Sequence, residues 1–172
     1  MTTPPLRLFF ALPCPPELAA RICLWRDSLQ LDGQPVAQAN LHLTLAFLGA
    51  VPRGRKTELR AIGERLPRPG FDLELDHLAR WSNGILHLAP SSVPAALHEL
   101  VHVLREELRA GGFEVEHRPF HPHITLARHA RSTPSATPSF RLPAQAVTLF
   151  SSENSPTGVR YRAIGDWPLD SV

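Results

Sequence analysis

The sequence is poor in lysine, methionine and tyrosine, and its charges nearly cancel. Lys56 is the only lysine among 18 basic residues, and the formal net charge is only +2. So small a charge excludes the dense basic surface that drives non-specific binding of nucleic acid, although it allows a polyanionic partner. We interpret the excess of arginine over lysine as a compositional bias before we interpret it as phosphate recognition.

Cysteine is also scarce, and no hydrophobic run is long. Cys14 and Cys23 are too few for a disulfide framework and lack the spacing of a metal site, which favours a reducing compartment. No apolar stretch approaches the ~18 residues that a membrane-spanning helix needs. The apolar run Leu8–Leu12 is too short for an export signal and is closed by Pro13. These absences predict a globular protein of the cytoplasm with no membrane partner.

Apolar patterning divides the chain into short elements. Apolar and β-favouring runs predict strands over residues 6–12, 41–48, 71–75, 85–89, 124–127, 146–150 and 159–164. Apolar residues at the helical period predict helices over residues 17–29, 57–66 and 94–109. We expect Gly49 to end the second strand and Ser92 to cap the third helix. Residues 131–139, rich in Ser, Thr and Pro, are predicted to form a mobile loop.

One order of elements occurs twice. Residues 6–12, 17–29 and 42–44 predict a strand, a helix and a strand that contains His-x-Thr, and residues 85–89, 94–109 and 123–125 repeat this order. The two His-x-Thr units lie 81 positions apart, close to the half-length of 86. The repetition predicts an α+β fold with two related lobes within a single domain, residues 1–172.

The two His-x-Thr units are candidate catalytic elements. In a strand, residues i and i+2 point to the same face, so His42 with Thr44, and His123 with Thr125, each present an imidazole beside a hydroxyl. Two such strands facing each other would surround a phosphate, with one histidine as general base and the other as general acid. The hydroxyls could bind phosphate oxygens, and Arg128 could neutralise their charge.

The bare pattern does not decide between catalysis and structure. With nine His and nine Thr in the chain, His-x-Thr is expected ~0.5 times by chance. Two half-buried histidines, hydrogen-bonded within strands, explain the spacing as well as catalysis does.

A second motif suggests a zinc hydrolase. His98-Glu-Leu-Val-His102 matches H-E-x-x-H on a predicted helix, with Glu99 as the candidate base. However, the apolar stripe of this helix passes through Leu97 and Val101, which turns both histidines toward solvent, and no third ligand follows. The pattern therefore favours a solvated helix face.

Other residues have both a functional and a structural interpretation. Phe47, Trp81 and Phe120 are possible base-stacking platforms, although single aromatic residues are more often part of a core. His121 is expected to order the entry to its strand or to touch substrate at the rim of a cleft. The basic residues within 53–56 could steer an anionic ligand, but we favour an ordinary basic loop.

Longer phrases around the two units are far more specific. They read Asn40-Leu-His-Leu-Thr-Leu-Ala-Phe-Leu-Gly49 and Arg118-Pro-Phe-His-Pro-His-Ile-Thr-Leu-Ala-Arg128, together with Leu6–Leu12, Arg160-Tyr-Arg and Trp167-Pro-Leu169. With them the chain resembles the RNA 2',3'-cyclic phosphodiesterases, formerly called 2'-5' RNA ligases, of the two-histidine phosphoesterase superfamily. The resemblance covers essentially the whole chain.

The resemblance implies a fold and an activity. The fold would be bilobal, with two pseudo-symmetric lobes, each with an antiparallel sheet and flanking helices, and an active-site cleft between the sheets. The activity would be hydrolysis of RNA 2',3'-cyclic phosphate ends to 2'-phosphates, without a metal or any other cofactor. RNA ends or nucleotides bearing the cyclic phosphate would be the partners of a monomeric enzyme. Reversible 2'-5' ligation of RNA ends is a further expectation.

The resemblance also implies roles for individual residues. His42 would be the general acid and His123 the general base, Thr44 and Thr125 would hold the phosphate, and Arg128 would contact substrate. His87 departs from the family, because relatives often have an aromatic residue there. A non-catalytic module that binds RNA ends stays open as an alternative, as does the zinc hydrolase.

Overall fold

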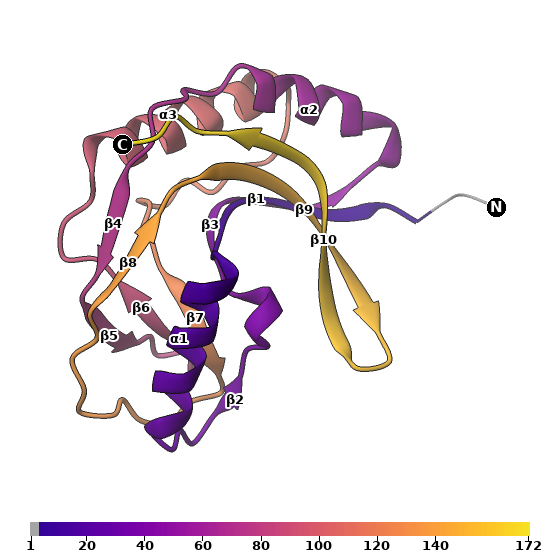
Figure 1. Cartoon of the computed structure of the whole chain (residues 1–172). Coiled ribbons are helices and arrows are strands. Elements are labelled where there is room, and N and C mark those ends of the chain that lie inside the picture. Colours follow the sequence, from indigo (N-terminus) through magenta and orange to yellow (C-terminus); the bar gives the residue numbers. More distant parts are fainter. Residues whose placement is uncertain (1–3) are drawn as a thin grey trace.

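The computed structural model describes residues 4–172 and contains three helices and ten strands in that range (Figure 1). The helices are α1 (Pro16–Ser28), α2 (Lys56–Glu64) and α3 (Ala95–Ala110). The strands are β1 (Leu6–Pro13), β2 (Gln34–Pro35), β3 (His42–Val51), β4 (Asp72–Leu75), β5 (His77–Arg80), β6 (Leu86–Ala89), β7 (Ile124–Arg128), β8 (Phe140–Pro143), β9 (Ala146–Ser155) and β10 (Gly158–Pro168). Short 3-10 turns occupy Gln38–Asn40 and Arg53–Arg55.

An antiparallel sheet runs through both halves of the chain. Its strand order is β10-β9-β1-β3-β7-β6-β5, with β2 paired to β7, and β4 and β8 form a separate pair. At the centre, β3 and β7 meet through one register pair, Leu43 opposite Ile124. The sheet therefore consists of two antiparallel sections joined at a narrow seam, and each section contributes one of the two His-x-Thr units.

The duplicated order of elements is present in the structure. In one section β1 and β3 are antiparallel neighbours connected through α1, and in the other β6 and β7 are antiparallel neighbours connected through α3. The predicted α+β fold with antiparallel sheets and flanking helices is confirmed. The pairing across the seam makes the sheets of the two lobes continuous.

The helices bury their apolar faces as the periodicity predicts. α3 buries the five residues Leu97, Leu100, Val101, Leu104 and Leu108, and its polar residues face outward. α1 buries Arg26 together with its apolar residues. The guanidinium Nη1 of Arg26 donates hydrogen bonds to the carbonyls of Val36 (2.6 Å) and Leu126 (3.2 Å), which satisfies the buried charge. Because Leu126 follows Thr125, this contact fixes the second His-x-Thr segment to the first helix.

Two predicted boundaries are wrong. Gly49 does not end its strand, because β3 continues to Val51 and Gly49 lies within it at φ +67°, next to a shift in the register with β1. The glycine thus serves a β-bulge. Ser92 does not cap α3, which begins at Ala95 after Pro94.

The structure also contains strands that the sequence patterns do not predict. β2, β5 and β8 are short, and β9 and β10 extend well beyond the predicted ranges to form a long hairpin that projects from the body (Figure 1). Residues 131–139 form neither helix nor strand, as expected for a loop. No helix within residues 4–172 has the length and apolar character needed to cross a membrane.

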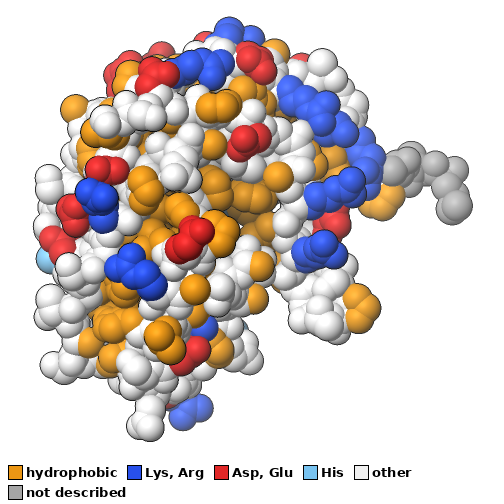
Figure 2. All heavy atoms as spheres, viewed as in Figure 1, with side chains coloured by type: hydrophobic (Ala, Val, Ile, Leu, Met, Phe, Trp, Pro, Cys, Tyr) orange, Lys and Arg blue, Asp and Glu red, His pale blue; other side chains and the backbone are white. Residues whose placement is uncertain are grey.

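Basic side chains gather over α2 and β10 on the face shown in Figure 2. Arg60 donates two hydrogen bonds to the carbonyl of Ile164, at 3.1 and 2.9 Å, and Arg68 donates one to the carbonyl of Pro168 at 3.2 Å. Both carbonyls belong to β10, the edge strand of the sheet. These arginines therefore cover a sheet edge that would otherwise be open to another strand.

Candidate functional site

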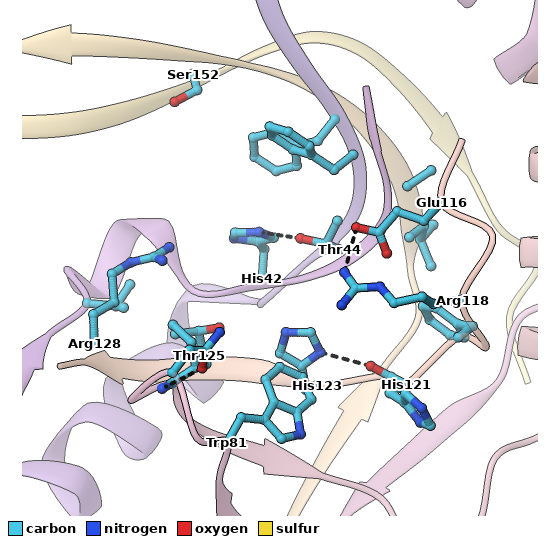
Figure 3. A pocket seen from close by; sticks show the side chains of 18 of the residues that line it. His42, Thr44, Trp81, Glu116, Arg118, His121, His123, Thr125, Arg128 and Ser152 are labelled. Carbon is cyan, nitrogen blue, oxygen red and sulfur yellow. Dashed lines mark hydrogen bonds and ion pairs between the residues drawn. The ribbon is translucent and has the colours of Figure 1, made fainter. Parts of the chain in front are cut away.

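A cleft of about 860 Å³ lies where the two sections of the sheet meet, and both His-x-Thr units line it (Figure 3). β3 contributes His42 and Thr44, and β7 contributes Thr125 and Arg128. His123 lies immediately before β7 and also lines the cleft. The structure thus brings together all five residues that the sequence marks as candidates.

The imidazole of His42 is held at both ring nitrogens. Its Nδ1 donates to the carbonyl of Asn40 at 2.8 Å, which leaves Nε2 as the unprotonated nitrogen of the neutral ring. Nε2 lies 2.9 Å from the hydroxyl Oγ1 of Thr44. The predicted placement of this imidazole and hydroxyl on one face of the strand is confirmed.

His123 repeats the contact that holds Nδ1 of His42. Its Nδ1 donates to the carbonyl of His121 at 2.8 Å, again two residues earlier in the chain. Nε2 is therefore the nitrogen available to a bound molecule. The His121 side chain also lines the cleft, and its role, in ordering the entry to the strand or in touching substrate, stays a prediction.

Aromatic rings surround His42. Its ring centroid is 4.9 Å from that of Phe9 and 5.2 Å from that of Tyr161, which meets it edge-on at 88°. Phe150 lies further away, at 6.5 Å. These rings come from β1, β9 and β10, so three strands of one section fix the orientation of a single imidazole.

A different pair of rings supports His123. Trp81 lies 4.5 Å from it, and His87 lies 5.4 Å from it and 4.1 Å from Trp81. Only 3% of His87 is exposed, so it belongs to the buried interior behind the cleft. Its Nδ1 donates to the carbonyl of Ile85 at 3.1 Å. His87 thus packs behind His123 much as Phe9 packs behind His42.

Burial lowers the pKa of both cleft histidines below the ordinary value of 6.5. For His42, the positive charges of His123 and Arg128 lower the pKa further, and the hydrogen bond to Asn40 opposes the shift. For His123, its hydrogen bond to the His121 carbonyl and the Glu116 carboxylate oppose the shift, while the His121 side chain adds to it. Both rings are therefore mainly neutral at pH 7 in the unliganded protein, and a bound anion would favour protonation of one.

Arginine side chains line the cleft around the histidines. Arg128 is where the sequence predicts it, and its charge acts on His42. Arg7, Arg105 and Arg118 also line the cleft, and Arg7 lies 5.6 Å above the ring of Phe47. The sequence patterns do not single these three out, although Arg118 is part of the second long phrase. Charge spacing gives no signal here, because the three come from three separate segments.

The three aromatic candidates all line the cleft. Phe47 is 45% exposed and Trp81 is 37% exposed, so neither is a core residue, and Phe120 is half-buried. By contrast, the basic residues of Arg53–Arg55 do not line the cleft. Arg53 donates to the carbonyl of Pro4 and Arg55 binds Glu58 and the carbonyl of Gly111, as an ordinary basic loop would.

The H-E-x-x-H helix has no metal-site geometry. His98, Glu99 and His102 are exposed on α3, and His102 Nε2 lies 3.4 Å from Glu106 of the same helix. In the part of the chain that the structure describes, no three His, Cys, Asp or Glu side chains are arranged to hold a metal ion. The solvated helix face that the sequence favours is what the structure contains.

Two histidines, each with Nδ1 held by a backbone carbonyl and each followed two residues later by a threonine, face one arginine-lined cleft between duplicated halves. This arrangement fits the class of two-histidine phosphoesterases. The chain belongs to the 2'-5' RNA ligase superfamily, whose sequence profile matches residues 14–160.

Comparison with characterised proteins agrees with this family. The chain is 36% identical to the RNA 2',3'-cyclic phosphodiesterase of Escherichia coli over 171 residues, which covers 96% of this chain and 97% of the relative. It is 30% identical to the RNA 2',3'-cyclic phosphodiesterase of Thermus thermophilus, with 95% and 90% of the two chains covered. The similarity therefore extends over nearly the full length of both relatives.

Solved structures have the same fold. The crystal structure of E. coli LigT complexed with 3'-AMP superposes with a TM-score of 0.90 at 36% identity, covering 97% of this chain and 99% of that one. TT0787 of Thermus thermophilus gives a TM-score of 0.80 at 26% identity, with 95% and 97% covered. The two-section sheet described above is thus the fold of these relatives.

Proposed function

We propose that this protein is a phosphodiesterase that opens the 2',3'-cyclic phosphate at RNA ends to a 2'-phosphate. The observation that carries the proposal is the pair of imidazoles, His42 and His123, which enter one cleft from opposite sections of the sheet with their Nδ1 atoms fixed. The names of the full-length relatives in E. coli and Thermus thermophilus support the same substrate class.

The proposed mechanism uses the two histidines in sequence. His123 takes a proton from water, whose oxygen forms the new bond to phosphorus, while the bond from phosphorus to O3' breaks. His42, protonated when the anionic substrate binds, gives its proton to the departing O3'. The hydroxyls of Thr44 and Thr125 donate to phosphate oxygens, and Arg128 balances their negative charge. The product keeps its phosphate on O2'.

The contributions of these groups suffice for catalysis without a cofactor. A positioned general acid or base typically gives 10²–10⁴-fold, so two histidines together account for a large acceleration of the opening of a strained ring. Hydrogen-bond donors aimed at the developing charge add to this. We propose a metal-independent enzyme on this basis.

The proposal extends to the organisation of the protein. Residues 1–172 form a single two-histidine phosphoesterase domain, in which His42-x-Thr44 and His123-x-Thr125 come from interleaved lobes. The protein acts as a monomer in the cytoplasm, and RNA ends bearing the cyclic phosphate are its partners. Joining of RNA ends through 2'-5' linkages uses the same residues with a 5'-hydroxyl in place of water: its proton passes to His123, its oxygen bonds to phosphorus, and the bond to O3' breaks as His42 protonates O3'.

Incubation of chelator-treated protein with a short RNA that ends in a 2',3'-cyclic phosphate tests the activity. We expect stoichiometric conversion to a 2'-phosphate end, identified by the position of the phosphate in the product. The double substitution His98→Ala and His102→Ala is the matched control, and we expect it to retain full activity, because these histidines lie outside the cleft.

Three other results would contradict the proposal. A 3'-phosphate product would show that O2', and not O3', is the leaving group. Tight binding of the RNA without any product would indicate a non-catalytic module. Stoichiometric zinc in the purified protein, together with loss of activity in the control variant, would favour the hydrolase based on the α3 histidines.

A further inference from the structure

The cleft contains more positive charge than the reacting phosphate needs. We infer that Arg118 binds the phosphodiester that precedes the terminal ribose, so that the enzyme prefers an RNA chain to a cyclic mononucleotide. This inference rests on the proposed function and identifies a residue that selects the length of the substrate.

The charge balance is the first support for this inference. Among the described residues that line the cleft are four arginines, Arg7, Arg105, Arg118 and Arg128, and one carboxylate, Glu116. A terminal cyclic phosphate carries a single negative charge. The whole chain has a net charge of only +2, so the excess of arginine here is local to the cleft. It fits a ligand with more than one phosphate.

The placement of two arginines separates their roles. Arg128 lies on one side of His42 and His123, next to Thr125, and Arg118 lies on the other side of the two histidines (Figure 3). Arg128 is the arginine whose charge acts on His42, so it belongs to the reacting phosphate. Arg118 is then left to the part of the substrate that extends beyond it. The volume of about 860 Å³ is large among ligand pockets and accommodates that extension.

The present partner of Arg118 is easily replaced. Its Nη2 lies 3.2 Å from Glu116 Oε1, and the two side chains are 79% and 52% exposed. An ion pair this exposed contributes little, so a phosphate can take the place of the carboxylate without a large loss.

The backbone at Arg118 is held while its side chain is free to exchange partners. Arg105 of α3 donates from Nη1 to the carbonyl of Arg118 at 2.9 Å, and the guanidinium of Arg105 lies 5.9 Å above the ring of Phe120. The segment that carries Arg118 is therefore anchored to α3 on one side and opens to the cleft on the other. This is the arrangement of a side chain that can change partner without moving its loop.

The test compares two substrates at several salt concentrations. One is a cyclic mononucleotide, and the other is a dinucleotide that ends in the same cyclic phosphate and has one internal phosphodiester. Each phosphate contact to a single strand contributes about 0.7 to the slope of log KM against log salt. For the wild-type protein we expect the dinucleotide slope to exceed the mononucleotide slope by about 0.7.

Arg118→Gln should remove this difference. We expect KM for the dinucleotide to rise about 3- to 10-fold, the extra salt dependence to disappear, and KM and kcat for the mononucleotide to stay unchanged. Arg109→Gln is the matched control, because Arg109 is an exposed arginine at the end of α3 outside the cleft. This control should leave KM unchanged for both the mononucleotide and the dinucleotide. Glu116→Gln frees Arg118 and should lower KM for the dinucleotide relative to the mononucleotide.

The outcomes separate this inference from the proposed function. If the wild type hydrolyses both substrates with equal KM and equal slope, or if Arg118→Gln affects both substrates alike, the inference is overturned while the activity stands. If the wild type hydrolyses neither, the proposed function fails. The dissociation constants of the two 2'-phosphorylated products, measured by titration calorimetry, then still test whether Arg118 selects the longer chain.

Discussion

The two histidines on which the proposed reaction depends have pKa values that burial shifts in the same direction. An unperturbed pair would titrate together near pH 6.5, and here both pKa values lie lower. The environments differ in charge, because Arg128 acts on His42 and the Glu116 carboxylate acts on His123. The positive charge of Arg128 makes protonated His42 a stronger acid, which suits a group that must protonate a leaving oxygen.

The pH dependence of kcat/KM follows from these shifts. This quantity reports the free enzyme, in which His42 must be protonated and His123 neutral. As the pH rises through the lowered pKa of His42, the required proton is lost. We therefore expect kcat/KM for a cyclic mononucleotide to peak below pH 6.5 and to fall toward alkaline pH.

The variant Arg128→Gln checks the cause of the shift. Removal of a positive charge beside His42 should move the alkaline limb of the profile to higher pH, even though KM rises because a phosphate contact is lost. A wild-type profile that is flat between pH 5 and 8, or an alkaline limb that does not move in this variant, would contradict the assignment of His42 as the general acid.

At the level of residues, the sequence predicted the groups that we propose to react but not those that support them. His42, Thr44, His123 and Thr125 share a pattern within a few positions, so local spacing reveals them. Tyr161 and Phe150 reach His42 from the far end of the chain through pairing of β9 and β10 with β1, which no local pattern contains. The burial of His87 behind His123 likewise depends on how β6 pairs with β7.

Among the elements, length and periodicity decided what could be predicted. α3 carries a long apolar stripe, α1 and α2 carry shorter ones, and the positions of all three helices are confirmed to within a few residues. β2, β5 and β8 have two to four residues each and exist because a neighbouring strand offers hydrogen-bond partners. β4 and β6 are as short as β5 and β8, but each lies in a five-residue segment whose alternating or continuous apolar residues predicted a strand.

The bulge at Gly49 gives a test at this scale. Its φ of +67° disfavours any residue with a side chain, yet a Cβ there would meet only a ring carbon of Phe47, at 3.7 Å. The cost of Gly49→Ala is therefore backbone strain alone, and we expect a loss of about 1–2 kcal/mol in the free energy of unfolding, measured with denaturant.

Gly54→Ala is the matched control, because Gly54 has no atom within 4 Å of the added Cβ and no positive φ. We expect it to change stability little. Equal effects of the two substitutions would show that the bulge does not require its glycine.

For the whole molecule, the essential feature is the convergence of two similar halves. Each supplies a strand–helix–strand unit with an imidazole at the start of its last strand or directly before it, and Nδ1 is held by the carbonyl two residues earlier. Within the sheet the halves meet where β7 pairs with β3 and with β2, so the cleft forms only when both are folded against each other. The duplication was visible in the sequence, but the convergence depends on the order of strands in the finished sheet.

The rates of His42→Ala, His123→Ala and the double variant on a cyclic-phosphate dinucleotide test this convergence directly, with circular dichroism to verify folding. Because both imidazoles serve one step, each single substitution should lower kcat by ~10² or more, and the double variant should lose little beyond the more damaging single change. Retention of more than about a tenth of wild-type turnover by either folded single variant would contradict the account.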